Sequence, residues 1–313
     1  MKIIFMGTPD FAVPSLEILL KNNYTVSAVV TAPDKPRGRG QEVSFTPVKE
    51  FAQKHSIPVL QPESLRDPQF ISTLANLAPD LFIIVAFRIL PKEVYSIPTK
   101  GSFNLHASLL PKYRGAAPIN WAIINGEKES GVTTFFLQDK VDTGNIILQK
   151  RIPISDEMNA GELHDALSEI GSNAVLETVR LIVSENANPQ QQDNTLASPA
   201  PKIFKETCRI QWNQNTNVIH NFVRGLSPYP SAWSVLDGKI FKLYKTEKMN
   251  NEFPSTLMPT VGTIILSENA KRLFVATREG WIEILELQQE GKKRMSAEEF
   301  LRGYRLTENA QFI

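Results

Sequence analysis

An asparagine, a histidine and an aspartate in this sequence could together hand an acyl group to an amine. Asn104 and His106 lie two residues apart in a predicted strand, so their side chains leave the same face. A side-chain amide can donate to the oxygen that becomes negative as an amine attacks a carbonyl carbon, and an imidazole can accept the released proton. Asp142, followed by Thr143 and Gly144, could orient the imidazole and stabilise its charged form.

The segment after His106 contains prolines, which restrict the conformation of the backbone. Residues 108–118 read Ser-Leu-Leu-Pro-Lys-Tyr-Arg-Gly-Ala-Ala-Pro, with two prolines, a Gly-Ala-Ala run and two cations. This composition predicts a stiff loop beside the end of the strand. The turn at 139–144 contains two aspartates, Asp139 and Asp142, and we expect Asp142 to be the one that takes part in catalysis.

The elements that must position these residues alternate between strand and helix over the first half of the chain. Short runs rich in Val and Ile predict strands that are apolar on both faces, as in a parallel sheet covered on both sides. We therefore expect an α/β, Rossmann-like domain with a mostly parallel sheet, and His106 at the edge where such sheets bind ligands. The predicted strands are 3–6, 25–30, 58–60, 81–86, 101–106, 133–137 and 145–151, and the predicted helices are 13–22, 47–54, 69–76 and 161–182.

A change in composition separates this half from the rest of the chain. Residues 185–201 are polar and rich in Pro without an apolar period, which predicts a linker. A short helix (217–224) and five strand-like runs with Asp-Gly and Glu-Gly turns follow, which favours an OB-like small β-barrel. The expected runs are 232–236, 240–244, 262–266, 273–276 and 281–287. We divide the chain into a catalytic domain (1–184), a linker (185–201) and a C-terminal β-barrel domain (202–313).

Composition excludes several classes of protein. The chain has 313 residues and a formal net charge of +1, so charge alone indicates no polyanionic partner. The single Cys208 excludes an intrachain disulfide and is expected to be buried filler. No apolar run reaches the roughly 18 residues of a membrane span, and the chain opens on a strand pattern, so a cytoplasmic protein is expected. His55, His164 and His220 lack zinc-ligand spacing, and no metal site is expected.

Two basic segments could contact the phosphates of a nucleic acid. The loop 34–40 contains Lys35, Arg37 and Arg39 among glycines, and a second cluster covers 291–295. Lys and Arg side chains in such segments bind phosphates by releasing counterions, although a solvated surface loop is an equally good interpretation of the first one. Trp212, Trp233 and Trp281 are expected to fill the core of the predicted barrel.

Several of these motifs resemble the folate-dependent formyltransferases. The Asn104-Leu105-His106 triplet, the Ser-Leu-Leu-Pro stretch at 108–111 and Asp142-Thr143-Gly144 resemble the core of that family. The motifs at 6–12, 37–40, 224–233 and 291–295 look like the branch that formylates methionyl initiator tRNA, and the resemblance covers essentially the whole chain. It implies 10-formyltetrahydrofolate as the donor and the α-amino group of methionyl initiator tRNA as the acceptor. We expect a monomer.

The resemblance also implies roles for particular residues. Asn104, His106 and Asp142 match the catalytic positions of the family. The residues expected to contact the folate are Phe87, Arg88, Ile89, Leu90, Pro91, Ser108, Leu109, Leu110, Pro111 and Asp139. The residues expected to contact tRNA are Arg37, Arg39, Lys202, Lys205, Lys292, Lys293 and Arg294. Arg88 departs from the family pattern, which often has a small residue there.

Two other functions fit part of the pattern. A formyltransferase acting on a purine precursor or an amino sugar would share the first domain, but the purine enzymes do not resemble the region after residue 201, and the sugar enzymes lack the basic motifs. A non-catalytic RNA-binding protein on the same fold is disfavoured by the intact Asn104, His106 and Asp142.

Overall fold

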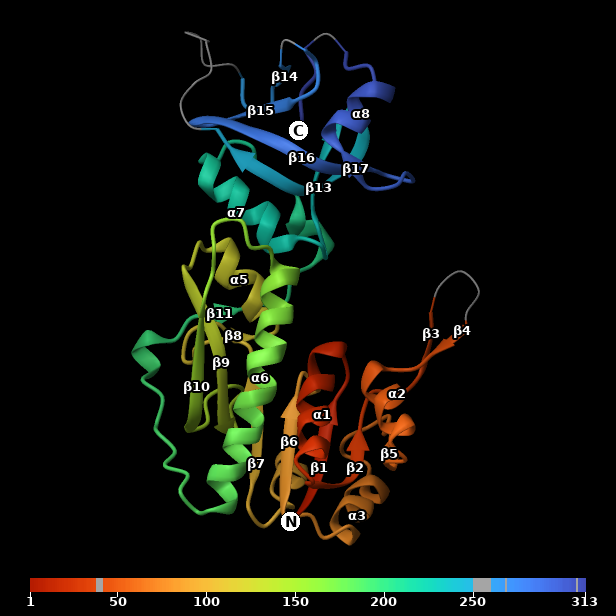
Figure 1. The fold of residues 1–313 in the computed structure, drawn as a ribbon, viewed down its shortest axis with the longest axis vertical. Helices are drawn as coiled ribbons and strands as arrows, with labels where there is room; N and C mark the ends of the chain where they lie inside the picture. The colour runs from red at the N-terminus through yellow and green to blue at the C-terminus, as the bar shows by residue number, and fades with distance from the viewer. Residues whose placement is uncertain (38–41, 250–259, 268, 308) are drawn as a thin grey trace. The chain divides into compact units, whose positions relative to one another are not determined.

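The computed structural model describes residues 1–37, 42–249, 260–267, 269–307 and 309–313. The chain divides into two compact units (Figure 1), each described by itself below. Unit 1 contains Met1–Gly115, Glu129–Ile152 and His164–Ala200, and unit 2 contains Ala116–Lys128, Pro153–Leu163 and Pro201–Ile313. Within the described part of the chain, no helix combines the length and the apolar character needed to cross a membrane.

Unit 1 is built on a seven-stranded sheet in the order β10-β9-β7-β6-β1-β2-β5. Its strands are β1 (Lys2–Gly7), β2 (Thr25–Val30), β5 (Val59–Leu60), β6 (Leu81–Val85), β7 (Ser102–His106), β9 (Glu129–Phe136) and β10 (Ile146–Pro153). The pairs β1–β2, β1–β6, β6–β7 and β2–β5 are parallel, whereas β7–β9 is antiparallel. The predicted Rossmann-like domain with a mostly parallel sheet is therefore confirmed.

The inner strands of the sheet are buried because helices cover them and supply apolar side chains. The helices that lie wholly or mostly in unit 1 are η1 (Asp10–Ala12), α1 (Val13–Lys21), α2 (Pro47–Lys54), α3 (Pro68–Asn76), α4 (Lys92–Tyr95), α6 (Ala160–Val183) and η2 (Asn194–Leu196). One core cluster joins Ile4 of β1 and Phe82 of β6 to Leu74 of α3. The long helix α6 contacts β9 through a hydrogen bond of 2.7 Å between the hydroxyls of Thr134 and Thr178.

The segment predicted as a loop at 34–40 begins with a strand instead. β3 (Lys35–Arg37) pairs antiparallel with β4 (Glu42–Ser44), so the described part of this segment is a hairpin. Arg39, which we expected to contact tRNA, lies outside the described residues.

Unit 2 contains an antiparallel sheet in the order β12-β13-β16-β15-β14, with β17 added beside β16. These elements are β12 (Ala232–Leu236), β13 (Lys239–Lys248), β14 (Ile264–Leu266), β15 (Leu273–Thr277), β16 (Gly280–Gln289) and β17 (Met295–Ser296), with helices α5 (Pro118–Ile124), η3 (Lys205–Cys208), α7 (Thr216–Leu226) and α8 (Ala297–Gly303). Where the sequence predicted an OB-like small β-barrel, the structure confirms a C-terminal antiparallel β-sheet domain, and each predicted strand corresponds to one of these strands.

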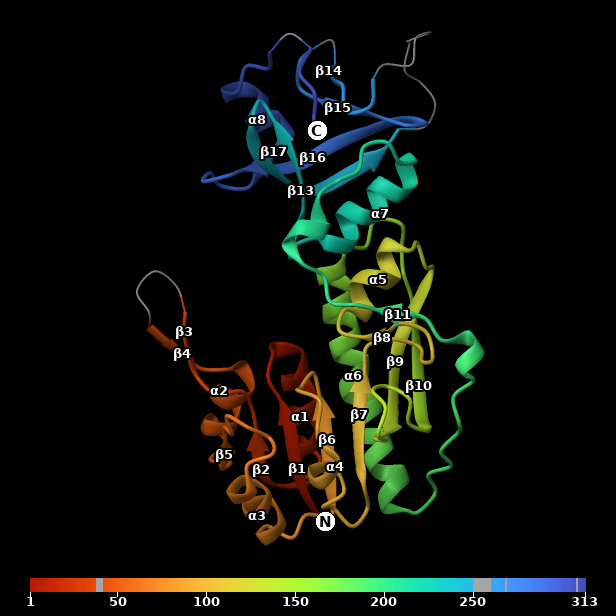
Figure 2. The same cartoon turned by 180° about the vertical axis from the view of Figure 1, so that it is seen from behind.

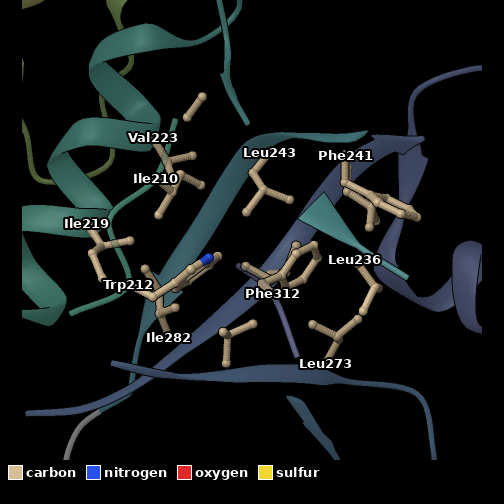
Figure 3. Close-up of a cluster of buried hydrophobic side chains, with 14 of the residues drawn as sticks. Ile210, Trp212, Ile219, Val223, Leu236, Phe241, Leu243, Leu273, Ile282 and Phe312 are labelled. Atoms are coloured by element: carbon tan, nitrogen blue, oxygen red, sulfur yellow. The ribbon is translucent and has the colours of Figure 1, made fainter. Parts of the chain in front are cut away.

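A compact apolar core holds this sheet to its helices (Figure 3). Trp212 is 4% exposed and stacks on Phe312 with ring centroids 5.6 Å apart, while Phe241 meets Phe312 edge-on. The indole N–H of Trp212 donates to Ser234 Oγ at 2.9 Å, so its polar atom is satisfied inside the core. Cys208 is buried as expected, and burial raises the pKa of its thiol.

His220 is a buried ionisable group on α7. Its Nδ1 accepts from the hydroxyl of Thr246 at 3.0 Å and its Nε2 donates to the carbonyl of Asp156 at 3.2 Å, an arrangement that suits the neutral ring. Burial lowers the pKa of His220 below its usual value.

This lowered pKa predicts a pH-dependent stability. The folded protein keeps His220 neutral while the unfolded chain takes up a proton below about pH 6.5, so the stabilisation present above that pH is lost as the pH falls. The contribution of His220 to the slope of the free energy of unfolding against pH should reach at most about 1.4 kcal/mol per pH unit. Urea unfolding at several pH values should show a shallower slope in His220→Gln, and the wild-type slope in His55→Gln, which changes an exposed histidine. Equal slopes in all three proteins would contradict the prediction.

Candidate active site

Strand β7 places Asn104 and His106 on one face at the C-terminal end of the strand. Asn104 lies opposite Phe135 of β9, and His106 lies opposite Thr133. His106 is 6% exposed and Asn104 is partly exposed. None of the described residues hydrogen-bonds the side-chain amide of Asn104, so its N–H groups are available to a ligand at this edge of the sheet.

The two ring nitrogens of His106 have different partners. Nε2 lies 2.8 Å from the carbonyl oxygen of Tyr113. A carbonyl oxygen can only accept, so Nε2 carries a proton and Nδ1 is the nitrogen that can take up another one. Nδ1 lies 3.8 Å from Asp142 Oδ2, with both side chains largely buried. A proton on Nδ1 would therefore face a nearby negative charge.

Tight backbone packing holds Asp142 in this place. Asp142 has φ of 55°, in the left-handed region, and its Oδ2 accepts from the backbone N–H of Gly115 at 2.9 Å. Two residues later, a Cβ on Gly144 would lie 1.6 Å from the carbonyl oxygen of Phe136. Only glycine can occupy that position, which explains why the Asp-Thr-Gly sequence ends as it does.

The loop that follows His106 is fixed to β9 and β10. Leu110 N donates to Thr133 Oγ1 at 3.0 Å, and Thr133 Oγ1 donates to the carbonyl of Ser108 at 2.6 Å. Gln149 Nε2 donates to the carbonyl of Leu110 at 2.9 Å. The peptide bond between Leu110 and Pro111 is cis, and Leu109 and Pro111 are partly exposed. Beyond this loop the chain forms the short strand β8 (Arg114–Gly115) and then α5, neither of which the sequence predicted.

The predicted folate residues after β6 have different environments. Leu90 is buried in the core cluster with Phe87 packed against it, whereas Ile89 is 74% exposed and Pro91 precedes α4. Arg88 donates to the carbonyls of residues 62 and 63 at 2.8 and 3.1 Å. Its Nε is buried without a hydrogen-bond partner among the described residues, and burial lowers the pKa of the guanidinium. Of these five, Ile89 has the side chain most open to a ligand.

The carboxylate of Asp139 contacts two residues of α4. Its Oδ1 accepts from the hydroxyl of Tyr95 at 2.5 Å and lies 3.5 Å from Lys92 Nζ. The Tyr95 hydroxyl and the charge of Lys92 lower the pKa of Asp139, and the carboxylate raises the pKa of Tyr95 to about 12. These residues line an open pocket of about 370 Å³ together with Leu137, Gln138, Lys140 and Thr143.

The predicted tRNA residues near the start of unit 2 are on its surface. Lys202 and Lys205 are exposed, and Lys202 Nζ lies 5.5 Å from the centre of the Phe204 ring, itself 54% exposed. The carbonyl of Lys205 accepts from the indole N–H of Trp233 at 2.8 Å. Arg37 ends β3 in unit 1.

The second basic cluster lies between β16 and β17. Lys292 and Lys293 are exposed on this turn. Arg294 differs from them because it forms an ion pair with Glu286 and lies over the Tyr244 ring, 4.3 Å from its centre. Lys292 and Lys293 are therefore the cations of this cluster with the side chains most open to a polyanion.

Sequence reasoning missed three residues that hold the predicted catalytic group. Tyr113, with φ of 62°, supplies the carbonyl for His106; Gly115 supplies the N–H for Asp142; and Gln192 donates to the carbonyls of residues 142 and 144. The glycine in Arg-Gly-Ala-Ala was a visible signal, but no pattern singled out Gln192. Among the described residues, no cluster of three His, Cys, Asp or Glu could hold a metal ion.

Known proteins resemble this chain over its whole length. The family models named Formyl transferase and Formyl transferase, C-terminal domain match residues 1–179 and 202–305. The methionyl-tRNA formyltransferase of Bacteroides thetaiotaomicron is 47% identical, covering 98% of this chain and 97% of the relative. That of Chlorobium phaeovibrioides is 49% identical, covering 100% and 98%. The N-formyltransferase of Helicobacter canadensis, solved with folinic acid and dTDP-3-aminofucose, is 25% identical with a TM-score of 0.67, covering 91% and 98%.

Proposed function

Because this chain belongs to the formyl transferase family, we propose that it transfers the formyl group of 10-formyltetrahydrofolate to the α-amino group of methionyl initiator tRNA. The product would be N-formylmethionyl-tRNA for translation initiation, made in the cytoplasm. The observation that carries the reaction type is the buried His106, whose Nδ1 lies 3.8 Å from Asp142 beside the free amide of Asn104. The acceptor is proposed from relatives that are 47 and 49% identical over nearly their full length.

Asn104 is proposed to stabilise the negative charge that develops during the reaction. The folate supplies a formyl carbon that an amine can attack, and its oxygen becomes negative as the new bond forms. The unpartnered N–H groups of Asn104, at the ligand-binding edge of the sheet, can donate to that oxygen. Such a donor stabilises a transition state by roughly 2.7–4 kcal/mol.

His106 is proposed to take the proton that the attacking amine loses and to return it to the folate nitrogen. The bond between that nitrogen and the formyl carbon breaks in this step, and tetrahydrofolate leaves. Since Tyr113 occupies Nε2, the acceptor is Nδ1, and Asp142 faces the imidazolium that results. A strong base is unnecessary, because free α-amino groups titrate near 7.7–8.0 and esterification removes the neighbouring carboxylate charge. One imidazole held by a carbonyl on one side and a carboxylate on the other is sufficient.

The remaining predicted residues are proposed as binding groups. The loops 87–91 and 108–111, which follow β6 and β7, would hold the folate beside His106, with Asp139 at the pocket lined by Lys92 and Tyr95. The exposed cations Lys202, Lys205, Lys292 and Lys293, together with Arg37, Arg39 and Arg294, would contact tRNA phosphates.

A competition between acceptors tests this function. The chain should transfer label from labelled 10-formyltetrahydrofolate to methionyl initiator tRNA far faster than to methionyl elongator tRNA or to a nucleotide-linked amino sugar. The three acceptors are offered at equal concentration, and the initial rates are compared. Preferential labelling of the amino sugar would assign the chain to the sugar formyltransferases, and absence of any labelled product would contradict the proposed reaction.

A further inference from the structure

A polar segment at the end of unit 1 lies against the loops of the candidate site. Residues 190–200 are called the strap from here on. After α6 the chain runs back beside β10 at the edge of the sheet (Figures 1 and 2), and Gln190 and Ile146 exchange two backbone hydrogen bonds of 2.8 Å. The strap then ends in β11 (Pro199–Ala200), which pairs in parallel with β8. The strap therefore contacts two segments close in sequence to the candidate pair: β8, which follows His106, and Ile146, which follows Asp142.

Gln192 is the polar residue of the strap that is buried, and Ala200 of β11 is its other buried residue. Gln192 is 5% exposed, whereas every other residue from 183 to 199 is exposed or partly exposed, and all of them are described. Its Nε2 donates to the carbonyl of Asp142 at 2.9 Å and to that of Gly144 at 2.8 Å. Its Oε1 accepts from Nε and Nη2 of Arg114 at 3.2 and 2.6 Å. An amide has two N–H groups and two lone pairs, so its hydrogen-bonding capacity is fully used.

These bonds close a ring around Asp142. The carbonyl of Asp142 is held through Gln192 to Arg114, and its carboxylate is held directly by the N–H of the next residue, Gly115, at 2.9 Å. Both ends of the aspartate are thereby fixed to two consecutive residues. These bonds also hold the backbone of Asp142, whose φ of 55° lies in the left-handed region that is uncommon for a non-glycine residue.

We propose that Gln192 is a positioning residue that keeps the Asp142 carboxylate beside Nδ1 of His106. It acts through Asp142 and has no contact with the reacting atoms. The inference rests on the proposed function, since the place of Asp142 matters for turnover only if His106 moves a proton. Residues 180–201 lie between the two matched family models, so neither model covers Gln192.

A kinetic comparison separates positioning from binding. Gln192→Leu should lower kcat by about tenfold or more and change KM for either substrate by less than about twofold, because a displaced Asp142 weakens only the transition state. The matched control is Gln191→Leu, the same change at the exposed neighbour, which should keep wild-type kinetics. Gln192→Glu keeps the side-chain length and the acceptor for Arg114 but loses both donors. It should likewise lower kcat and leave KM nearly unchanged, although its side chain has almost the same shape as that of glutamine.

A double-mutant cycle shows whether Gln192 acts through Asp142. In an Asp142→Asn background, Gln192→Leu should lower kcat by less than about a further twofold, because the carboxylate it positions is already gone. Wild-type kcat in both Gln192 variants overturns the proposal. A tenfold loss that persists in full in the Asp142→Asn background also overturns it, since the effect would then be general to the fold.

A readout independent of turnover keeps this inference apart from the proposed function. The Gly115 amide donates to the Asp142 carboxylate, so its hydrogen exchange, measured by NMR, reports whether the carboxylate has moved. Exchange should be at least about tenfold faster in both Gln192 variants and unchanged in Gln191→Leu. Unchanged exchange in the Gln192 variants overturns the inference. If the wild-type protein formylates no acceptor, the proposed function fails, while this measurement still decides whether Gln192 fixes Asp142.

Discussion

His106→Ala should lower kcat for formyl transfer by about 10²- to 10⁴-fold, the range found when a general base is removed. The reason is that Nδ1 is the ring nitrogen able to accept a proton, since the Tyr113 carbonyl occupies Nε2. Nδ1 belongs to a buried side chain and lies 3.8 Å from Asp142 Oδ2. KM for methionyl-tRNA should stay nearly constant, because the buried ring offers little surface to the nucleic acid. Steady-state kinetics with charged initiator tRNA measure both quantities.

Asp142→Asn tests the other member of the same pair. Since the carboxylate is proposed to act through the imidazolium, the double variant with His106→Ala should be little slower than His106→Ala alone. His55→Ala is the control, because His55 is exposed at the end of α2. Turnover within about twofold of wild type in both single variants would remove the mechanism.

Replacing both Lys292 and Lys293 with alanine should weaken the use of tRNA and leave the chemistry intact. Each lysine that contacts a phosphate contributes about one unit to the slope of log KM against log salt, so the slope should fall by about two. Both side chains are exposed on the turn between β16 and β17. KM for methionyl-tRNA should rise several-fold at low salt, with kcat unchanged.

Two comparisons make this result specific to phosphate binding. Lys54→Ala removes an exposed lysine at the end of α2 and should leave KM and its salt slope as in the wild type. A methionine ester, which has no phosphates, should be used equally by the wild type and the double variant. An unchanged salt slope in the double variant would argue against a phosphate-binding role for this turn.

Local patterns predicted most of the fold. The runs 25–30, 47–54 and 232–236 coincide with β2, α2 and β12, because the pattern of apolar residues that predicts a helix or a strand is a property of the segment itself. α8 was missed although its capping box was visible, with Ser296 and Glu299 bonding each other's backbone N–H groups. β8 and β11 left no such pattern, because two-residue strands are fixed by what they pair with.

Only the part of the candidate site that lies on a single strand could be predicted from the sequence. Asn104 and His106 share a strand, so their common face follows from the period of two. That Asp142 reaches His106 depends on a left-handed residue and on the close approach of Gly144 to Phe136, which are tertiary facts. Gln192 lies in a polar, Pro-rich stretch that predicts a linker, and its burial arises from hydrogen bonds to distant residues. The catalytic roles of these residues stay predictions.

The strap also changes where a catalytic fragment of this enzyme should be cut. A boundary at residue 179, where the first family model ends, would remove Gln192 and β11 and leave Arg114, Asp142 and Gly144 without their shared amide. A boundary after Ala200 keeps the whole ring with unit 1. Chimaeras that exchange the C-terminal region between relatives should therefore be joined after this residue, because Gln192 and β11, in the stretch between the family models, bond to residues of unit 1.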